Sequence, residues 1–370
     1  MKMNILLFCK DEKTYSIFCI LLFLFFISAC SSASEETIDN IINTEKADSI
    51  SGKKDSNAEN TDSITGKTDQ SGEGVIAPEE ELPDTIFKLE EYIQLHHGNN
   101  YGEGAAQYGD YLFQASLGSE LHIYNFAEKK YITTIKLSSI GHADTMCFGI
   151  EKVDENDEFP VLYISESKVY EEGKKGDIYV YRLLRETDEQ GVESWKGALC
   201  QRIKTPDVAI AGAYPDVVID EKNKDMWIVG VHSRVGYNSN DGCGWTYIFS
   251  KYSLPSITDG TKNKNGIYQL LLSEEGRQSY FLLYDLHATT QGLCFYNGMI
   301  ICPYGKPAVS YKGIDFVDVN KQQVIANVNL AGSIIYEAEA AVVANDELYI
   351  VGQKNFVYKC SGIDISSLSR

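Results

Sequence analysis

From residue 84 onward, short runs of alternating hydrophobic and polar residues are separated by turn residues such as Gly, Asn and Asp. Alternation of this kind is typical of β-strands with one buried face, and few stretches carry the 3.6-residue period of a helix. Three runs align from a first polar residue to the middle of the next strand, namely residues 103–113, 291–301 and 339–349. Two further copies begin at Asp144 and Asp216 and have longer turns. The pattern therefore predicts five related β units.

Each unit continues into two further strand-like runs, such as residues 120–127 followed by residues 130–137. Four antiparallel strands repeated around a circle form a β-propeller, which leaves only short, protected sheet edges. The last unit ends with residues 355–360 and lacks a fourth strand, so we expect residues 87–95 from the other end of the chain to supply it. The predicted fold class is therefore all-β: a single β-propeller of four-stranded antiparallel blades, with its ring closed by an N-terminal strand.

The number of blades depends on how the two long units are interpreted. Five blades are expected if residues 186–193 and 257–276 are insertions in these units. Six is the alternative, with an additional blade within residues 244–287. The 24 Tyr residues suit an all-β protein of either form, because aromatic rings pack well on pleated sheets.

The first 29 residues have the pattern of a secretory signal peptide. Three Lys precede the apolar run Ile17–Ile27, which has 11 residues, whereas a helix needs about 20 to cross a bilayer. The four residues that end at Cys30, Ile-Ser-Ala-Cys, resemble a bacterial lipobox, in which the Cys becomes the lipidated first residue of the mature chain. We therefore expect lipidation at Cys30; an uncleaved anchor helix is the alternative.

Residues 30–83 are predicted to be a lipidated Cys followed by a disordered tether. This stretch consists largely of Ser, Thr, Asp, Asn, Glu, Lys and Gly and has almost no aromatic residues, so it cannot bury enough apolar surface to offset the entropy cost of ordering. The expected organisation is a signal peptide at 1–29, the tether at 30–83 and the propeller at 84–370. The expected location is extracytoplasmic, lipid-anchored to the bacterial cell envelope, and specifically to the outer membrane.

The charge and the cysteines exclude some classes of function. With 33 Lys and Arg against 53 Asp and Glu, the formal net charge is -20, which argues against nucleic acid because each phosphate contact needs a basic residue. Six Cys follow Cys30, and none of them forms a Cys-x-x-Cys pair, which argues against a zinc knuckle or a thioredoxin-like redox centre. The acidic run 154–158 is interpreted as a solvated turn.

Polar residues from distant parts of the chain are expected to meet on one face of the propeller. The innermost strand of each blade lines the central axis, and the loops that lead into these strands share one face. The first positions of the five inner strands are Glu103, Asp144, Asp216, Gln291 and Glu339. The loops of the same face hold His97, His142, His232, Arg234 and His287. These ten residues form the predicted ligand-binding set.

Three interpretations of this set remain open. Carboxylates crowded together repel one another, and a cation would relieve the repulsion. Oxygen ligands favour Ca²⁺ or Mg²⁺, whereas His with one or two acids favours Zn²⁺ or Mn²⁺, and the candidate metal ligands are His142, His232, His287, Glu103 and Glu339. Alternatively the acids bind only ordered water along a polar channel, or the face recognises a polar ligand such as a glycan directly.

The combination of lipobox, tether and blade repeat resembles the β-propeller lipoproteins of Bacteroidetes, whose functions are largely unassigned. The resemblance implies a secreted or surface-exposed protein. Through the lipid anchor the outer or inner membrane is the expected partner, and the polar face of the propeller makes a glycan or an envelope protein the expected second partner. The expected function is a binding or scaffold module. The alternatives are a glycoside hydrolase or metal-assisted hydrolase or lyase that uses Asp144, Asp216, His142 and His287, and a structural envelope component.

Overall fold

The computed structural model describes residues 87–96, 102–116, 118–166, 176–206, 208–233, 244–287, 290–305, 311–330, 332–333, 335, 337–354 and 356–368. The predicted signal peptide, Cys30 and the predicted tether lie outside the described residues, as do His97 and Arg234. Within the described part of the chain, no helix has both the length and the apolar character needed to cross a membrane.

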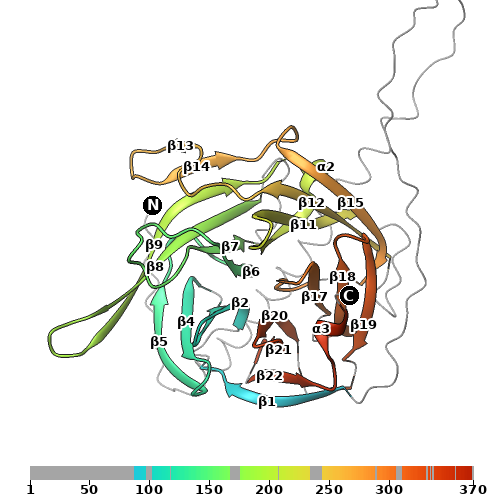
Figure 1. The fold of residues 1–370 in the computed structure, drawn as a ribbon, viewed down its shortest axis with the longest axis horizontal. Helices are drawn as coiled ribbons and strands as arrows, with labels where there is room; N and C mark the ends of the chain where they lie inside the picture. The colour runs from blue at the N-terminus through green and yellow to red at the C-terminus, as the bar shows by residue number, and fades with distance from the viewer. Residues whose placement is uncertain are drawn as a thin grey trace, which may run out of the picture. The chain divides into compact units, whose positions relative to one another are not determined.

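The described residues form five β-sheets that are arranged as the blades of a propeller, so the predicted fold class is confirmed (Figure 1). In each of the first three blades four antiparallel strands follow one another from the hub to the rim. Blade 1 consists of β2 (Gly102–Tyr108), β3 (Tyr111–Ser116), β4 (Glu120–Asn125) and β5 (Lys130–Lys136). Blade 2 consists of β6 (Ala143–Phe148), β7 (Leu162–Glu166), β8 (Asp177–Thr187) and β9 (Glu193–Lys204). Blade 3 consists of β10 (Ala213–Asp220), β11 (Asp225–Ser233), β12 (Trp245–Ser253) and β15 (Arg277–Leu286).

The last two blades have the same plan, and two helices of one turn each complete the described structure. Blade 4 consists of β16 (Cys294–Tyr296), β17 (Met299–Gly305), β18 (Lys312–Asp318) and β19 (Gln323–Asn329). Blade 5 consists of β20 (Ala338–Ala344), β21 (Glu347–Gly352), β22 (Phe356–Ser361) and β1 (Lys88–Gln94). The helices are α2 (Val208–Ala211) and α3 (Ile365–Leu368).

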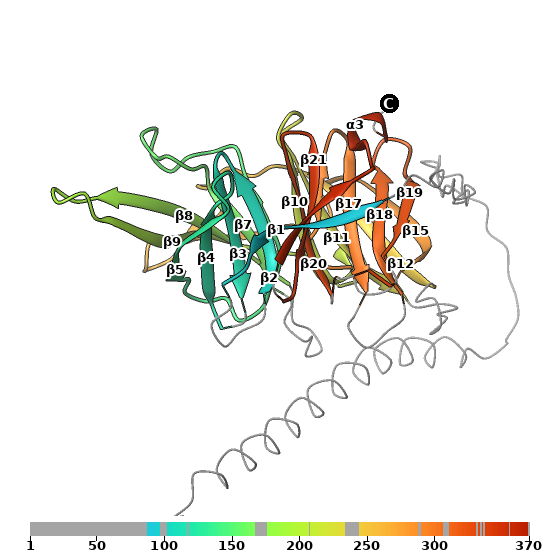
Figure 2. The ribbon, with the colours of Figure 1, turned by 90° about the horizontal axis from the view of Figure 1, so that it is seen from below.

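The two ends of the described chain close the ring, as the sequence predicts. β1 pairs antiparallel with β22, from Lys88 opposite Ser361 to Gln94 opposite Phe356, and runs along the outer side of blade 5 (Figure 2). Ile93 of β1 is fully buried in a hydrophobic cluster that joins blade 5 to blade 1. Closure therefore combines a strand pairing with the burial of an apolar side chain.

The two insertions extend blade 2 and do not form a sixth blade. Residues 186–193 are the tip of the long β8–β9 hairpin, which projects outward from the ring (Figures 1 and 2). Residues 257–276 contain β13 (Thr261–Lys262) and β14 (Tyr268–Leu271), and β14 pairs in parallel with β9. Because the rest of residues 244–287 supplies β12 and β15 of blade 3, five blades is the correct number.

Hydrophobic side chains fill the spaces between neighbouring blades. Between blades 1 and 2, Phe113 and Phe148 pack edge to face with ring centroids 5.3 Å apart, and Phe159 and Trp195 complete the cluster. Such aromatic pairs add about 0.5–1.5 kcal/mol to the effect of burial alone. Apolar residues from inner, middle and outer strands therefore hold neighbouring blades against each other.

At the hub the inner strands approach so closely that glycine is required. A Cβ atom on Gly104 of β2 would lie 2.5 Å from the carbonyl oxygen of Asp144 in β6. A Cβ atom on Gly292 would lie 2.8 Å from the carbonyl oxygen of Glu339 and 2.9 Å from that of Asp144. The backbone N–H of Gly292 also donates a hydrogen bond to the carbonyl oxygen of Glu339, 2.7 Å. Backbone contacts of this kind fix the positions of the residues that begin the inner strands.

The acidic run 154–158 is not simply a solvated turn, so that interpretation is wrong for Asp157. Its carboxyl group is buried and accepts two hydrogen bonds from Arg182 of β8, 2.8 and 2.5 Å.

The five described cysteines, Cys147, Cys200, Cys294, Cys302 and Cys360, are free thiols.

Candidate functional site

Four of the five inner strands have a shift of register at the end that begins the blade. The shifts lie between Gly102 and Ala105 in β2, Ala143 and Met146 in β6, Ala213 and Asp216 in β10, and Ala338 and Ala340 in β20. A β-bulge turns a side chain out of the regular alternation of a strand. The predicted carboxylates of these strands lie within the shifts or at their ends, so the bulges determine where the carboxylates point.

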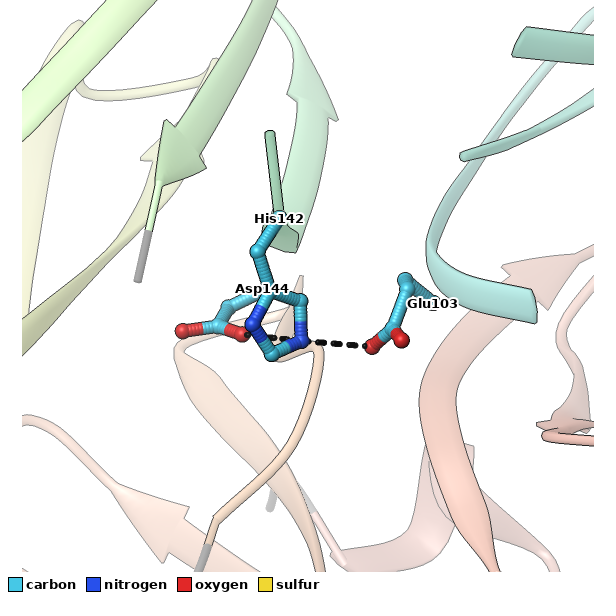
Figure 3. A group of neighbouring side chains, drawn as sticks. All are labelled: Glu103, His142 and Asp144. Atoms are coloured by element: carbon cyan, nitrogen blue, oxygen red, sulfur yellow. Dashed lines mark hydrogen bonds and ion pairs between the residues drawn. The ribbon is translucent and has the colours of Figure 1, made fainter. Parts of the chain in front are cut away.

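The starts of β2 and β6 bring Glu103, His142 and Asp144 together, and we call these three residues the hub cluster (Figure 3). A hydrogen bond links Nε2 of His142 to Oε2 of Glu103, 3.0 Å, and Oδ1 of Asp144 lies 3.7 Å from the same nitrogen. The side chain of His142 is 44% exposed, whereas those of Glu103 and Asp144 are 9% and 17% exposed. The cluster is therefore open to solvent on the side of the imidazole.

The charge on His142 depends on its carboxylate neighbours. Burial alone would lower the pKa of His142, but the hydrogen bond to Glu103 and the charges of Asp144, Glu103 and Glu166 outweigh this effect and raise the pKa to about 9. The imidazole is consequently protonated near neutral pH. Its positive charge partly neutralises a group of several acids.

Asp216 lies deeper and has a different environment. It is buried, and its Oδ1 accepts hydrogen bonds from the hydroxyl groups of Thr145, 2.7 Å, and Ser165, 3.1 Å. Burial and the charge of Asp144 raise the pKa of Asp216 well above its usual range, although the two hydroxyl groups act in the opposite direction. Asp144 and Asp216 thus differ in exposure, as in pairs of carboxyl groups that divide the roles of acid and base.

The start of blade 5 adds two more buried carboxyl groups, Glu337 and Glu339. Burial and the charges of Glu337, Glu103 and Asp144 raise the pKa of Glu339 well above its usual range. The side-chain amide of Gln291 donates to Oε1 of Glu337, 3.1 Å, and that of Gln353 donates to its Oε2, 2.7 Å. Sequence reasoning missed Glu337, although its position two residues before Glu339 was a usable signal.

Glu166 at the end of β7 was also missed. Its carboxyl group is buried and accepts a hydrogen bond from the backbone N–H of Gly141, 2.8 Å, next to His142 in sequence. Because Glu166 pairs with Ala143 across the β6–β7 ladder, it lies at the level of the hub cluster. The contact holds the loop that carries His142 against blade 2.

His287 lies in a separate polar cluster in blade 4. Its Nδ1 is 3.1 Å from Oδ2 of the buried Asp315, and its ring stacks on that of Tyr304 with centroids 3.9 Å apart. The amide of Asn327 donates to Oδ1 of Asp315, 2.6 Å, and to the hydroxyl oxygen of Tyr304, 3.0 Å. A carboxylate that fixes one imidazole nitrogen sets the orientation of the ring.

The structure brings together part of the predicted set. In the part of the chain that it describes, the hub cluster is the group whose ligand atoms lie within 4.8 Å of one another. His232 is exposed at the end of β11, and neither it nor His287 or Glu339 belongs to that group. The predicted metal set is therefore divided between the hub cluster and other positions.

Comparisons with known proteins assign neither a family nor a function to this chain. No family model matches the chain, and no curated protein matches it. Among solved structures, the chain is similar to a glutaminyl cyclase from Myxococcus xanthus, with 10% identity, a TM-score of 0.42, and coverage of 74% of this chain and 95% of that chain. It is also similar to a luciferin-regenerating enzyme, with 12% identity, a TM-score of 0.38, and coverage of 71% and 92%. Similarity at these scores carries no argument about activity.

Proposed function

We propose that this chain is a lipid-anchored, extracytoplasmic binding module that captures a polar ligand at the hub cluster. The observation that carries the proposal is the position of His142, a half-exposed imidazole held between two carboxylates at the place where the inner strands begin. The charges of Glu103 and Asp144 also act on the buried carboxyl group of Glu339. To a ligand the cluster offers the imidazole of His142 and the partly exposed carboxylate of Asp144.

This donor and acceptor pattern favours a ligand rich in hydroxyl groups, such as a glycan. Carboxylates accept hydrogen bonds from hydroxyl groups, and charge-assisted bonds of this kind are about twice as strong as neutral ones. The ligand would meet a rigid site, because the close contact between Gly104 and Asp144 leaves the inner strands little freedom to move. Preorganisation of this kind reduces the entropy cost of binding.

A glycan array probed with the full chain in detergent tests this proposal. The comparison is between the wild type, Glu103→Gln in the hub cluster and Glu186→Gln, an exposed carboxylate that pairs with Lys196 at the remote hairpin. We expect a glycan signal that falls at least tenfold in Glu103→Gln and is unchanged in Glu186→Gln. No bound glycan, or equal signals from both variants, would contradict the proposal.

A glycoside hydrolase on the same face is the second candidate. The observation that favours it is the contrast between partly exposed Asp144 and buried Asp216, whose pKa is raised. Glycoside hydrolysis uses two carboxyl groups in different environments, one as the acid and the other as the base or nucleophile. Release of reducing sugar by the wild type and its loss in Asp144→Asn and Asp216→Asn would favour the enzyme over the binding module.

The lipid anchor is tested separately. Mass spectrometry of the N-terminal peptide of the wild type, expressed in a bacterium, should show cleavage before Cys30 and a lipid on its sulfur. An N-terminal peptide with an unmodified Cys30 would refute lipidation at this residue. It would leave the proposal for the hub cluster unaffected.

A further inference from the structure

We propose that the hub cluster is a three-ligand site for a divalent transition-metal ion of the Zn²⁺ type, formed by Oε2 of Glu103, Nε2 of His142 and Oδ1 of Asp144. The inference deepens the proposed function by naming what would hold the captured ligand. Metal binding itself does not depend on that ligand and is measured without it.

The spacing of the three ligand atoms fits such an ion. They lie within 4.8 Å of one another, with Nε2 of His142 at 3.0 Å from Glu103 and 3.7 Å from Asp144. Zn²⁺ binds nitrogen and carboxylate oxygen at about 2.0–2.2 Å, which places neighbouring ligand atoms about 3.0–3.6 Å apart. The two distances from His142 are close to this range, and the two carboxylate oxygens, which lie within 4.8 Å of each other, would move together by up to about 1 Å to close around the ion.

The type of ligand selects the class of ion. One imidazole nitrogen with two carboxylate oxygens suits Zn²⁺ and its first-row neighbours. Ca²⁺ instead takes six to eight oxygen ligands, and Mg²⁺ keeps most of its water. The imidazole of His142 therefore favours a transition metal, and Glu103 and Asp144 contribute the negative charge. Coordination through Nε2 requires that His142 releases its proton to solvent, so the ion replaces the proton between the imidazole and the carboxylates.

The surrounding charge also favours a dication. Asp216 and Glu339 are buried, and both experience the like charge of Asp144. Glu103 acts on Glu339 in the same way. A divalent ion between Glu103 and Asp144 would neutralise the charges that act on both buried acids. The backbone supports the geometry, since Gly104 packs against Asp144 and Glu166 holds Gly141.

Three protein ligands leave at least one coordination position for another molecule. Structural zinc sites usually have four protein ligands, whereas sites that bind or transform a ligand keep an open position. The side chains of His142 and Asp144 are 44% and 17% exposed, so solvent reaches the cluster from their side. A hydroxyl or carboxylate oxygen of the captured ligand can occupy the open position.

The test is a titration of the untagged full chain in detergent with Zn²⁺, after removal of bound metal with a chelator. A chromophoric competitor for Zn²⁺ gives affinity and stoichiometry. We expect one tight site per chain, at least tenfold weaker in Glu103→Gln, His142→Ala and Asp144→Asn, and unchanged in Glu186→Gln. Equal affinity in all variants, or tighter binding of Ca²⁺ or Mg²⁺ than of Zn²⁺, would overturn the assignment.

A second measurement distinguishes the loss of metal binding from the loss of folding in a variant. Co²⁺ in place of Zn²⁺ gives visible absorption that depends on its ligands, and we expect the spectrum of the wild type to be lost in Asp144→Asn at a temperature where circular dichroism shows both proteins folded. An identical Co²⁺ spectrum in the two proteins would overturn the site. If the titration finds no Zn²⁺ site at the hub cluster while the glycan still binds, the metal inference fails and the proposed binding function stands.

Discussion

Gly104→Ala should force apart the two inner strands that carry the hub cluster. The new Cβ atom would lie 2.5 Å from the carbonyl oxygen of Asp144 and 2.9 Å from its carbonyl carbon. Carbon–oxygen contacts between strands settle at about 3.3 Å or more, so β2 and β6 must separate by about 0.8 Å. Both atoms belong to the backbone, and a rotamer change cannot relieve the clash.

The size of the effect follows from known costs of overpacking. Extra methyl groups in well-packed regions destabilise by about 1–3 kcal/mol. Replacement of Gly also restricts the unfolded chain, which offsets about 0.4–1 kcal/mol of that cost. A net loss of about 1–2 kcal/mol corresponds to a fall in Tm of about 2–8 °C for a domain of this size.

Thermal unfolding followed by circular dichroism measures the fall in Tm. The matched control is Gly276→Ala, where a Cβ atom would lie 3.6 Å from the nearest atom, an ordinary contact. Gly104→Ala should also weaken Zn²⁺ binding, because Glu103 and Asp144 lie on opposite sides of the widened contact. If Gly104→Ala and Gly276→Ala unfold within 1 °C of each other, the close approach of the inner strands is refuted.

Three further variants test the ring, the buried acid and the blade 2 turn. Ile93→Ala removes a fully buried side chain from the closing strand and should cost about 2–5 kcal/mol in urea unfolding; wild-type stability would mean that β1 does not close the ring. Asp216→Asn should raise the free energy of unfolding at pH 7 but not at pH 3.5, with a chelator present in both measurements. The folded protein holds the Asp216 proton more tightly than the unfolded chain, so stability falls as pH rises from the unfolded pKa toward the folded one, by about 1.4 kcal/mol for each unit of pKa difference. A difference between the two proteins that does not change with pH would contradict this. Asp157→Asn weakens the paired hydrogen bonds from Arg182 and should cost about 1–3 kcal/mol, and an unchanged Tm would show that this pair is dispensable.

The fold could be predicted from the sequence to the level of individual strands. The repeat that begins at Glu103 and recurs at Glu339 marks inner strands because alternation and turn residues are local signals. Because the last unit lacks a fourth strand, residues 87–95 were expected to supply it, and β1 is that strand. The parallel pairing of β14 with β9 could not be predicted, since it depends on where an insertion meets a neighbouring blade in space.

The candidate site could be predicted only in part. Sequence reasoning found Glu103, His142 and Asp144, because the first positions of inner strands converge at a hub. It could not separate His287 from this group, because the residue that orients His287 is Asp315, a buried carboxyl group between the apolar residues Ile314 and Phe316. The bulges that direct the carboxylates depend on pairing between strands, and no local pattern reveals them.

The most direct measurement is an anomalous difference map at the zinc absorption edge, from crystals of the chain grown with Zn²⁺. The account predicts a single strong peak at about 2.0–2.2 Å from Oε2 of Glu103, Nε2 of His142 and Oδ1 of Asp144. A map without a peak at the hub cluster, or with the zinc held by other side chains, would contradict it.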